Sequence, residues 1–244
     1  RNIMDVIITV VQSRQSDKFP DGEKLLFMSK IIEKFEDHHA KVQETSLTAM
    51  MAGVPLFKPF LPSVLYKIIA KISYYITDLK ESQKKSAIEL LWKLNEQLPA
   101  RELLEHSLKA YHSLASVNSQ LACLDIIASS LESLESQEYS SYLVKSVISR
   151  ICGIFKEKSH DKKVCETVMR VIKTSLHLND SITRSMFAIQ PLTLQSKVLE
   201  YAEKYEPQIL VQLNANTQET YHHLYARTQH LTVEPPAPPL KQSA

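Results

Sequence analysis

The sequence predicts an all-α protein built as an α-solenoid of about five helix pairs. Only 3 of its 244 residues are glycine, against roughly 7% in ordinary proteins. Tight hairpins and phosphate-cradling loops both depend on glycine. This composition therefore excludes many-stranded sandwiches and barrels, Rossmann folds and P-loop enzymes. Two further observations support the prediction of a helical solenoid: the period of the apolar residues and the regular spacing of the short polar joints.

The helical period is clearest from residue 61 to residue 76, where apolar residues recur at spacings of three and four. These residues are Leu61, Val64, Leu65, Ile68, Ile69, Ile72 and Ile76. The same spacing returns over 121–134, 143–155 and 164–176. The period-two alternation of half-buried strands is absent over any useful length. Every segment between the joints is therefore predicted to be a helix.

Prolines and polar joints set the boundaries of these helices, since proline does not fit a helix interior. We expect no proline to interrupt a helix. The predicted pairs are 21–35 with 41–51, 60–76 with 81–98, 100–114 with 119–134, 139–156 with 162–178, and 181–187 with 193–205. Successive pairs begin about 40 residues apart, which matches the HEAT type of two-helix repeat. Stacking would bury the apolar stripe that each pair cannot bury alone.

The expected organisation has four parts. A leading helix and loop over 1–20 is a candidate cap, and the solenoid occupies 21–205. Residues 206–232 contain one candidate extra helix, at 218–230, and 233–244 form a Pro-rich flexible tail. An irregular helical bundle is the alternative architecture. Short polar joints at alternate junctions favour the solenoid.

Charge, cysteines and motifs point away from catalysis. The net charge is only +2, from 29 basic and 27 acidic residues, which is no nucleic-acid signature. The apolar runs are too short to enter a membrane as a span. Three unpatterned cysteines fit reduced thiols in the cytoplasm. Metal-ligand sets, nucleophile elbows and cofactor motifs are all missing, so we expect no enzyme activity, cofactor or metal.

Large aromatic residues inside the predicted helices are expected to pack. Trp92 follows Leu91, one step off the apolar stripe, and Tyr74 and Tyr75 lie near the end of their helix. We expect these side chains to lie in the core or between repeats. An exposed binding platform is the alternative.

The joints within the pairs carry the main functional signal. In a stack of helix pairs they line up along one edge, which we call the turn edge. Its residues are 36–41, 78–85, 116–119 and 156–163. Basic residues recur where each second helix begins, except in the third pair. The helix dipole favours acids there, so the recurrence suggests an acidic partner; a merely solvated polar edge is the alternative.

The candidate partner-binding residues all lie on the turn edge. They are Lys41, Lys84, Lys85, Lys162, Lys163, His38 and His39. The adjacent pair His38 and His39 does not share a helix face, so it is not a metal pair.

Three segments carry a resemblance to a known family. FEDHHAKVQETSLTAM (35–50) resembles the loop-then-helix pattern of TOG domains, and EKSHDKKVCETVMRVI (157–172) repeats it. TOG domains are short HEAT arrays of microtubule regulators. LTLQSKVLEYAEKY (192–205) resembles the last helix of the C-terminal domain in cytoplasmic linker-associated proteins, the CLASP family. The resemblance covers about residues 21–205.

The resemblance implies a non-catalytic scaffold of the cytoplasm and cytoskeleton. It would bind tubulin or microtubule-associated partners, such as plus-end or kinetochore proteins, through the lysines of the turn edge. TOG domains that bind tubulin usually carry a Trp in the first intra-repeat loop; here neither 36–40 nor 14–20 contains one, although Phe19 lies in the second. The third joint has no basic residue. Both departures favour the docking role of the CLASP C-terminal domain. A HEAT adaptor in a transport, chromosome or signalling complex is the alternative function.

Overall fold

The computed structural model describes residues 20–77 and 80–214 of the chain. All regular elements over these residues are α-helices, as the sequence predicts. The chain divides after Gln190 into two compact units, which are described separately. Within the described ranges, no helix is both long and apolar enough to serve as a membrane span.

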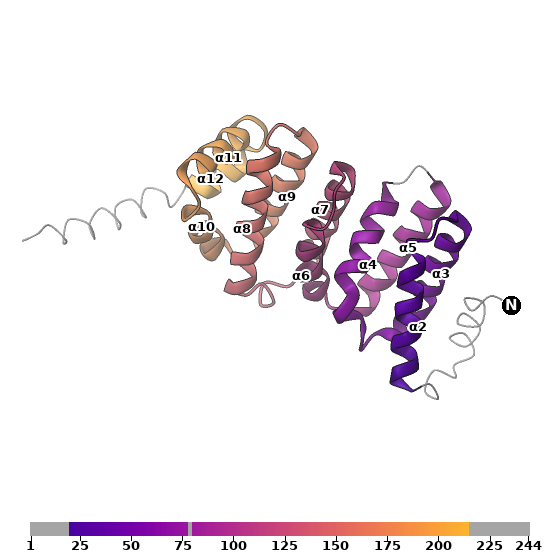
Figure 1. The fold of residues 1–244 in the computed structure, drawn as a ribbon. Coiled ribbons are helices and arrows are strands. Elements are labelled where there is room, and N and C mark those ends of the chain that lie inside the picture. The colour runs from indigo at the N-terminus through magenta and orange to yellow at the C-terminus, as the bar shows by residue number, and fades with distance from the viewer. Residues whose placement is uncertain (1–19, 78–79, 215–244) are drawn as a thin grey trace, which may run out of the picture. The chain divides into compact units, whose positions relative to one another are not determined.

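The first unit contains nine described helices (Figure 1). They are α2 (Asp21–Lys34), α3 (Ala40–Phe57), α4 (Leu61–Ile76), α5 (Glu81–Gln97), α6 (Ala100–Tyr111), α7 (Val117–Glu132), α8 (Ser141–Lys158), α9 (Lys162–Leu178) and α10 (Asp180–Ala188). The described part of the second unit contains α11 (Leu192–Tyr205) and α12 (Pro207–Asn214), which pack on each other.

The helices of the first unit pack as consecutive pairs. α2 packs on α3, α4 on α5, α6 on α7, and α8 on α9. Neighbouring pairs are joined mainly by α3 on α5, α4 on α6 and α7, and α7 on α9, while α10 covers α8 and α9. This is the predicted HEAT-like array. The core of the array consists of the apolar stripes of its helices. In α4, the fully buried residues include Leu65, Ile68, Ile69 and Ile72.

Residues about one repeat apart in sequence form polar contacts across neighbouring pairs, four between side chains and one from the Tyr75 hydroxyl to the backbone carbonyl of Phe35. The contacts join Phe35 to Tyr75, Gln43 to Gln83, Thr77 to Ser119, Asp125 to Thr167, and Glu132 to Arg170. Their sequence separations are 40, 40, 42, 42 and 38 residues. The period in the sequence is thus the physical repeat of the stack.

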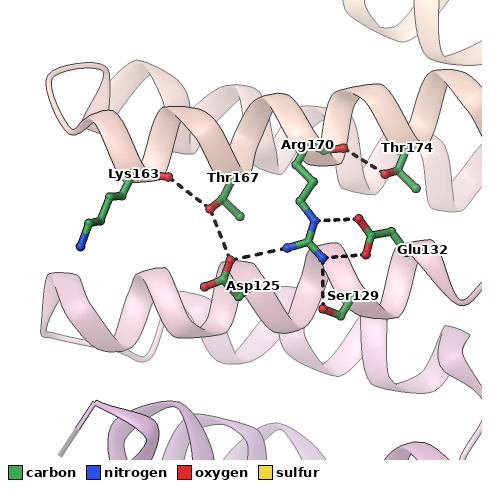
Figure 2. A network of polar contacts seen from close by, with 7 residues as sticks. All are labelled: Asp125, Ser129, Glu132, Lys163, Thr167, Arg170 and Thr174. Atoms are coloured by element: carbon green, nitrogen blue, oxygen red, sulfur yellow. Dashed lines mark hydrogen bonds and ion pairs between the residues drawn. The ribbon is translucent and has the colours of Figure 1, made fainter. Parts of the chain in front are cut away.

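The most extensive of these contacts joins α7 to α9 (Figure 2). Arg170 Nε and Nη2 donate to the two carboxylate oxygens of Glu132, each at 2.6 Å. Arg170 Nη2 also donates to Ser129 Oγ at 3.4 Å, and Nη1 lies 3.8 Å from Asp125 Oδ1. Thr167 Oγ1, one turn earlier on α9, donates to the same Asp125 oxygen. A two-pronged guanidinium–carboxylate pair holds both helices in register.

Replacing Arg170 by alanine should lower the free energy of unfolding by about 1 kcal/mol, because the paired side chains are still two-fifths exposed. Lysine should not restore the loss, since it lacks the planar fork. Urea denaturation measures the free energy of unfolding of both variants. The matched control is Arg101→Ala, which breaks a similarly exposed pair with Glu105 inside α6 and should cost less than half as much. Equal losses for Arg170→Ala and Arg101→Ala would contradict a clamp between helix pairs.

One proline prediction is wrong. α3 was expected to end near residue 51, with Pro55 outside it, but α3 continues to Phe57 and contains Pro55. Pro55 cannot donate a hydrogen bond to the carbonyl of Met51. It lies in the last turn, so one missing bond is tolerated while Val54 and Phe57 become fully buried.

The remaining predictions concern the two ends of the chain. α12 falls in the stretch from residue 206 where the pattern weakens, and it was not expected as a separate helix. The helices predicted at 2–13 and 218–230, the loop 14–19 and the tail 233–244 lie outside the described residues. α10 and α11, predicted as a fifth pair, belong to different units, so their pairing stays a prediction.

Candidate functional site

The turns within the helix pairs lie on one side of the first unit (Figure 1). Gln43 Nε2, from the start of α3, donates to the carbonyl of Asp37 in the first turn. Gln83, from the start of α5, donates in turn to Gln43. Thr77 at the end of α4 lies 3.5 Å from Ser119 at the start of α7. These contacts link described residues that flank the first three turns.

The predicted lysines all lie at the same end of their helices. Lys41 is the second residue of α3, Lys84 and Lys85 are the fourth and fifth of α5, and Lys162 and Lys163 open α9. α3 and α5 pack directly on each other, so the first three lysines belong to neighbouring helices. α9 packs on α7, which places the last two lysines beyond the third turn.

Carboxylates hold these lysines only weakly. Lys84 Nζ lies 4.0 Å from Glu81, Lys85 Nζ lies 4.0 Å from Glu89, and Lys162 Nζ lies 3.6 Å from Glu166. Over the described ranges, the structure shows no ion pair for Lys41 or Lys163. Exposed pairs at such distances contribute little, so the ammonium groups remain available to a partner.

The first turn keeps negative charges beside its lysine. Asp37 accepts the backbone N–H of His39 at 3.0 Å and an ammonium hydrogen of Lys34 at 3.2 Å. These bonds lower the pKa of Asp37, and the hydrogen bond from Lys71 lowers that of Glu36. Both carboxyl groups are therefore ionised at neutral pH. His38 and His39 are exposed in this turn. Residues 20–77 and 80–214 contain no cluster of His, Cys, Asp and Glu suited to a metal ion.

The third turn is uncharged, as its sequence indicates. Ser116 caps α7 by accepting the N–H of Ser119 at 3.1 Å, and Val117 beside it is 42% exposed. The pKa of His112 at the end of α6 is lowered mainly by burial and also by the positive charge of Arg150. The third turn is therefore a neutral, partly apolar stretch. It lies between the lysines of the first two turns, which stand beside acidic residues, and those of the fourth.

The expectation for two of the aromatic residues is wrong. Trp92 is 69% exposed and Tyr74 is 53% exposed, whereas Tyr75 is buried and its hydroxyl donates to the carbonyl of Phe35. Trp92 lies off the buried stripe of α5, which consists of Gln83, Ala87, Leu90 and Leu94. Its place one step after Leu91 was the signal in the sequence that could have identified an exposed aromatic residue.

Comparison with known proteins identifies the architecture. No family model and no curated protein matches the sequence. Among solved structures, a chain from the structural work on microtubule plus-end tracking by XMAP215, CLIP-170 and EB1 is 14% identical, with a TM-score of 0.57 and 83% of each chain covered. The fold of this chain is that of a TOG domain.

Two further structures with this TOG fold agree. Crescerin, which uses a TOG domain array to regulate microtubules in the primary cilium, matches with 15% identity and a TM-score of 0.60, over 86% of this chain and 84% of its own. TOG3 of Drosophila melanogaster Mini spindles matches with 13% identity and a TM-score of 0.55, over 82% of this chain and 85% of its own. At such identities the likeness concerns the fold alone.

Proposed function

We propose that this chain is a non-catalytic scaffold of the microtubule cytoskeleton that binds an acidic protein surface through the turn edge. The observation that carries the proposal is the alignment of the basic helix starts of α3, α5 and α9 on one side of a TOG fold. Its partner is tubulin itself or a microtubule-associated protein at plus ends or kinetochores, as in the CLASP C-terminal domain. No cofactor or metal takes part.

Rigidity and charge together support this role. Stacked helices hold Lys41, Lys85 and Lys163 in fixed relative positions, so little ordering is required when a partner binds. Their positive charges would speed association with an acidic surface and select against basic ones. The neutral third turn, with the exposed Val117, would lie between the lysines of the first two turns and those of the fourth, and supply apolar contact.

Reversing one lysine on each helix start should abolish binding. The variant is Lys41→Glu, Lys85→Glu and Lys163→Glu, three exposed residues. We expect at least a tenfold loss of affinity, about 1.4 kcal/mol or more. Three assays measure it: gel filtration with tubulin dimers, co-sedimentation with pure microtubules, and co-sedimentation with microtubules that carry their associated proteins. Binding by the native chain should weaken as salt is raised.

The control carries the same change of charge at the other ends of the helices. Lys58 follows α3, Lys145 lies in the first turns of α8, and Lys173 lies in the second half of α9; all three are exposed. Their triple reversal to glutamate should leave binding intact. If the native chain binds in none of the three assays, or if both triple variants weaken it equally, the proposal is wrong. The HEAT adaptor of another assembly would then be the better explanation.

A further inference from the structure

Trp92 belongs neither to the buried core nor to the turn edge. It is the single tryptophan of the chain, and 69% of its surface is exposed on α5. An exposed indole contributes nothing to the core, whereas tryptophan is among the residues that dominate the energetics of protein interfaces. Its surroundings therefore decide whether it marks a binding surface.

A groove lies beside Trp92, between α5 and α7. α5 packs on α3 and α4, and α7 packs on α4, α6 and α9, but α5 and α7 make no comparable contact with each other. The opening between them has a volume of about 430 Å³. Leu91 and Asn95 of α5 line it. Trp92 is not one of the lining residues, but it follows Leu91 and lies about one helical turn before Asn95, which puts the rim of the groove within reach of its indole.

The wall of the groove formed by α7 indicates what shape of ligand would fit it. α7 contributes Asn118, Leu121, Ala122, Asp125, Ile126, Ser129 and Ser130. This stripe repeats at spacings of three and four and extends for about 18 Å along the helix axis. A third helix of about three turns matches that length, and grooves between helices commonly accept the apolar face of an amphipathic helix.

Asp125 determines the charge of that helix. It is the one charged residue among the described groove-lining residues, and it is half-buried, with its side chain 55% exposed. Burial raises the pKa of Asp125, although Arg170 and Thr167 partly offset the effect. Arg170 makes its short hydrogen bonds to Glu132 and stays 3.8 Å from Asp125. Arg170 and Thr167 both contact Oδ1 of Asp125, so its other carboxylate oxygen is left to a further cation.

We propose that the groove between α5 and α7 binds an amphipathic helix of another protein, with its apolar face on Leu91 and Leu121, a lysine or arginine against Asp125, and Trp92 closing over one side. This surface shares Asn118 with the turn edge but none of its lysines, and it goes beyond the proposed function. The cation complements the single charge of the groove, and Trp92 supplies apolar area and a ring face for that cation.

Trp92 itself reports the outcome, because no other tryptophan contributes to the emission. The probes are three helical peptides of about 14 residues, free of aromatic residues and with a leucine face. They differ only in a central Arg, Gln or Glu. The Arg peptide should shift the Trp92 emission to the blue and protect it from acrylamide. The Glu peptide should bind about fivefold more weakly, and Asp125→Asn should remove that difference.

Fluorescently labelled Arg peptide provides a second readout by anisotropy. Trp92→Ala should weaken its binding, while Tyr142→Ala, which removes an aromatic residue 74% exposed on α8, should not. The triple reversal on the turn edge should also leave peptide binding unchanged, which separates this proposal from the proposed function. Equal binding of the Arg and Glu peptides, or no effect of any peptide on the emission, would overturn it. So would a blue shift caused by protein concentration alone, since the occupant would then be a second copy.

Discussion

Replacing Gly53 by alanine should lower the free energy of unfolding by about 2 kcal/mol. In an exposed helix the same change would be favourable by up to about 1 kcal/mol. Gly53, however, is buried in α3, and a Cβ atom there would lie 2.8 Å from Cδ2 of Phe57 and closer still to Cε2. The Phe57 ring is fully buried, so it has no space into which it can move. Thermal and urea denaturation measure the loss.

Gly153 is the matched control for this substitution. It is half-buried in α8, and nothing lies within 4 Å of a Cβ built on it. Gly153→Ala should therefore stabilise the protein by about 0.5–1 kcal/mol. Phe57→Leu should recover part of the loss in a Gly53→Ala background, as expected for two groups in contact. If both glycine variants were stabilised, the close packing of α3 would be contradicted.

The protein should lose stability steeply in alkaline solution. Burial raises the pKa of Cys123 and of Cys152 from 9.0 to about 12. Because the folded pKa lies above the unfolded one, each thiol favours the folded state fully below pH 9 and progressively less as the pH rises to about 12. The two thiols together remove about 3 kcal/mol per pH unit in that window. Burial also raises the pKa of Tyr111 to about 12, which adds to the loss above pH 10.

Urea denaturation at several pH values, under a reducing agent, measures this slope. Cys123→Ala and Cys152→Ala should each reduce the loss per pH unit, even though both variants begin from a lower stability at pH 7 because a core atom is removed. Cys165→Ala should change the slope less, because this thiol is less deeply desolvated. A slope unaffected by the first two substitutions would show that other groups cause the alkaline loss.

The helical array could be predicted because one physical requirement governs most of its residues. A stripe such as Leu65, Ile68, Ile69 and Ile72 must be buried by a neighbour, and every pair meets this need in the same way. The repeat of about 40 residues in the sequence therefore reappears as contacts between equivalent positions. The separations from Phe35 to Tyr75 and from Gln43 to Gln83 are both 40 residues.

The errors at Pro55 and Trp92 have different causes. Proline disfavours a helix interior in general, but at Pro55 the burial of Val54 and Phe57 extends α3 six residues past its expected end. Tryptophan is highly buried on average in proteins, but Trp92 lies off the buried stripe of α5. There the general preference was given more weight than the position of the residue on its helix.

The candidate site was predictable only in part. The order of the helices placed Lys41, Lys85 and Lys163 at equivalent helix starts, and the structure has them there. The groove beside Trp92 depends on α7 packing against α4 instead of α5, a choice that no single segment of sequence records. The partner-binding role of the lysines remains a prediction for the binding assays.

The polar links one repeat apart have a mechanical consequence. Each of them joins only adjacent helix pairs, so no side chain described as a link fastens one end of the first unit to the other. Under tension, such an array is expected to open one pair at a time and to close in the same order. The clamp of Arg170 on Glu132 would then be one of the contacts that must break, together with the apolar packing, before α9 separates from α7.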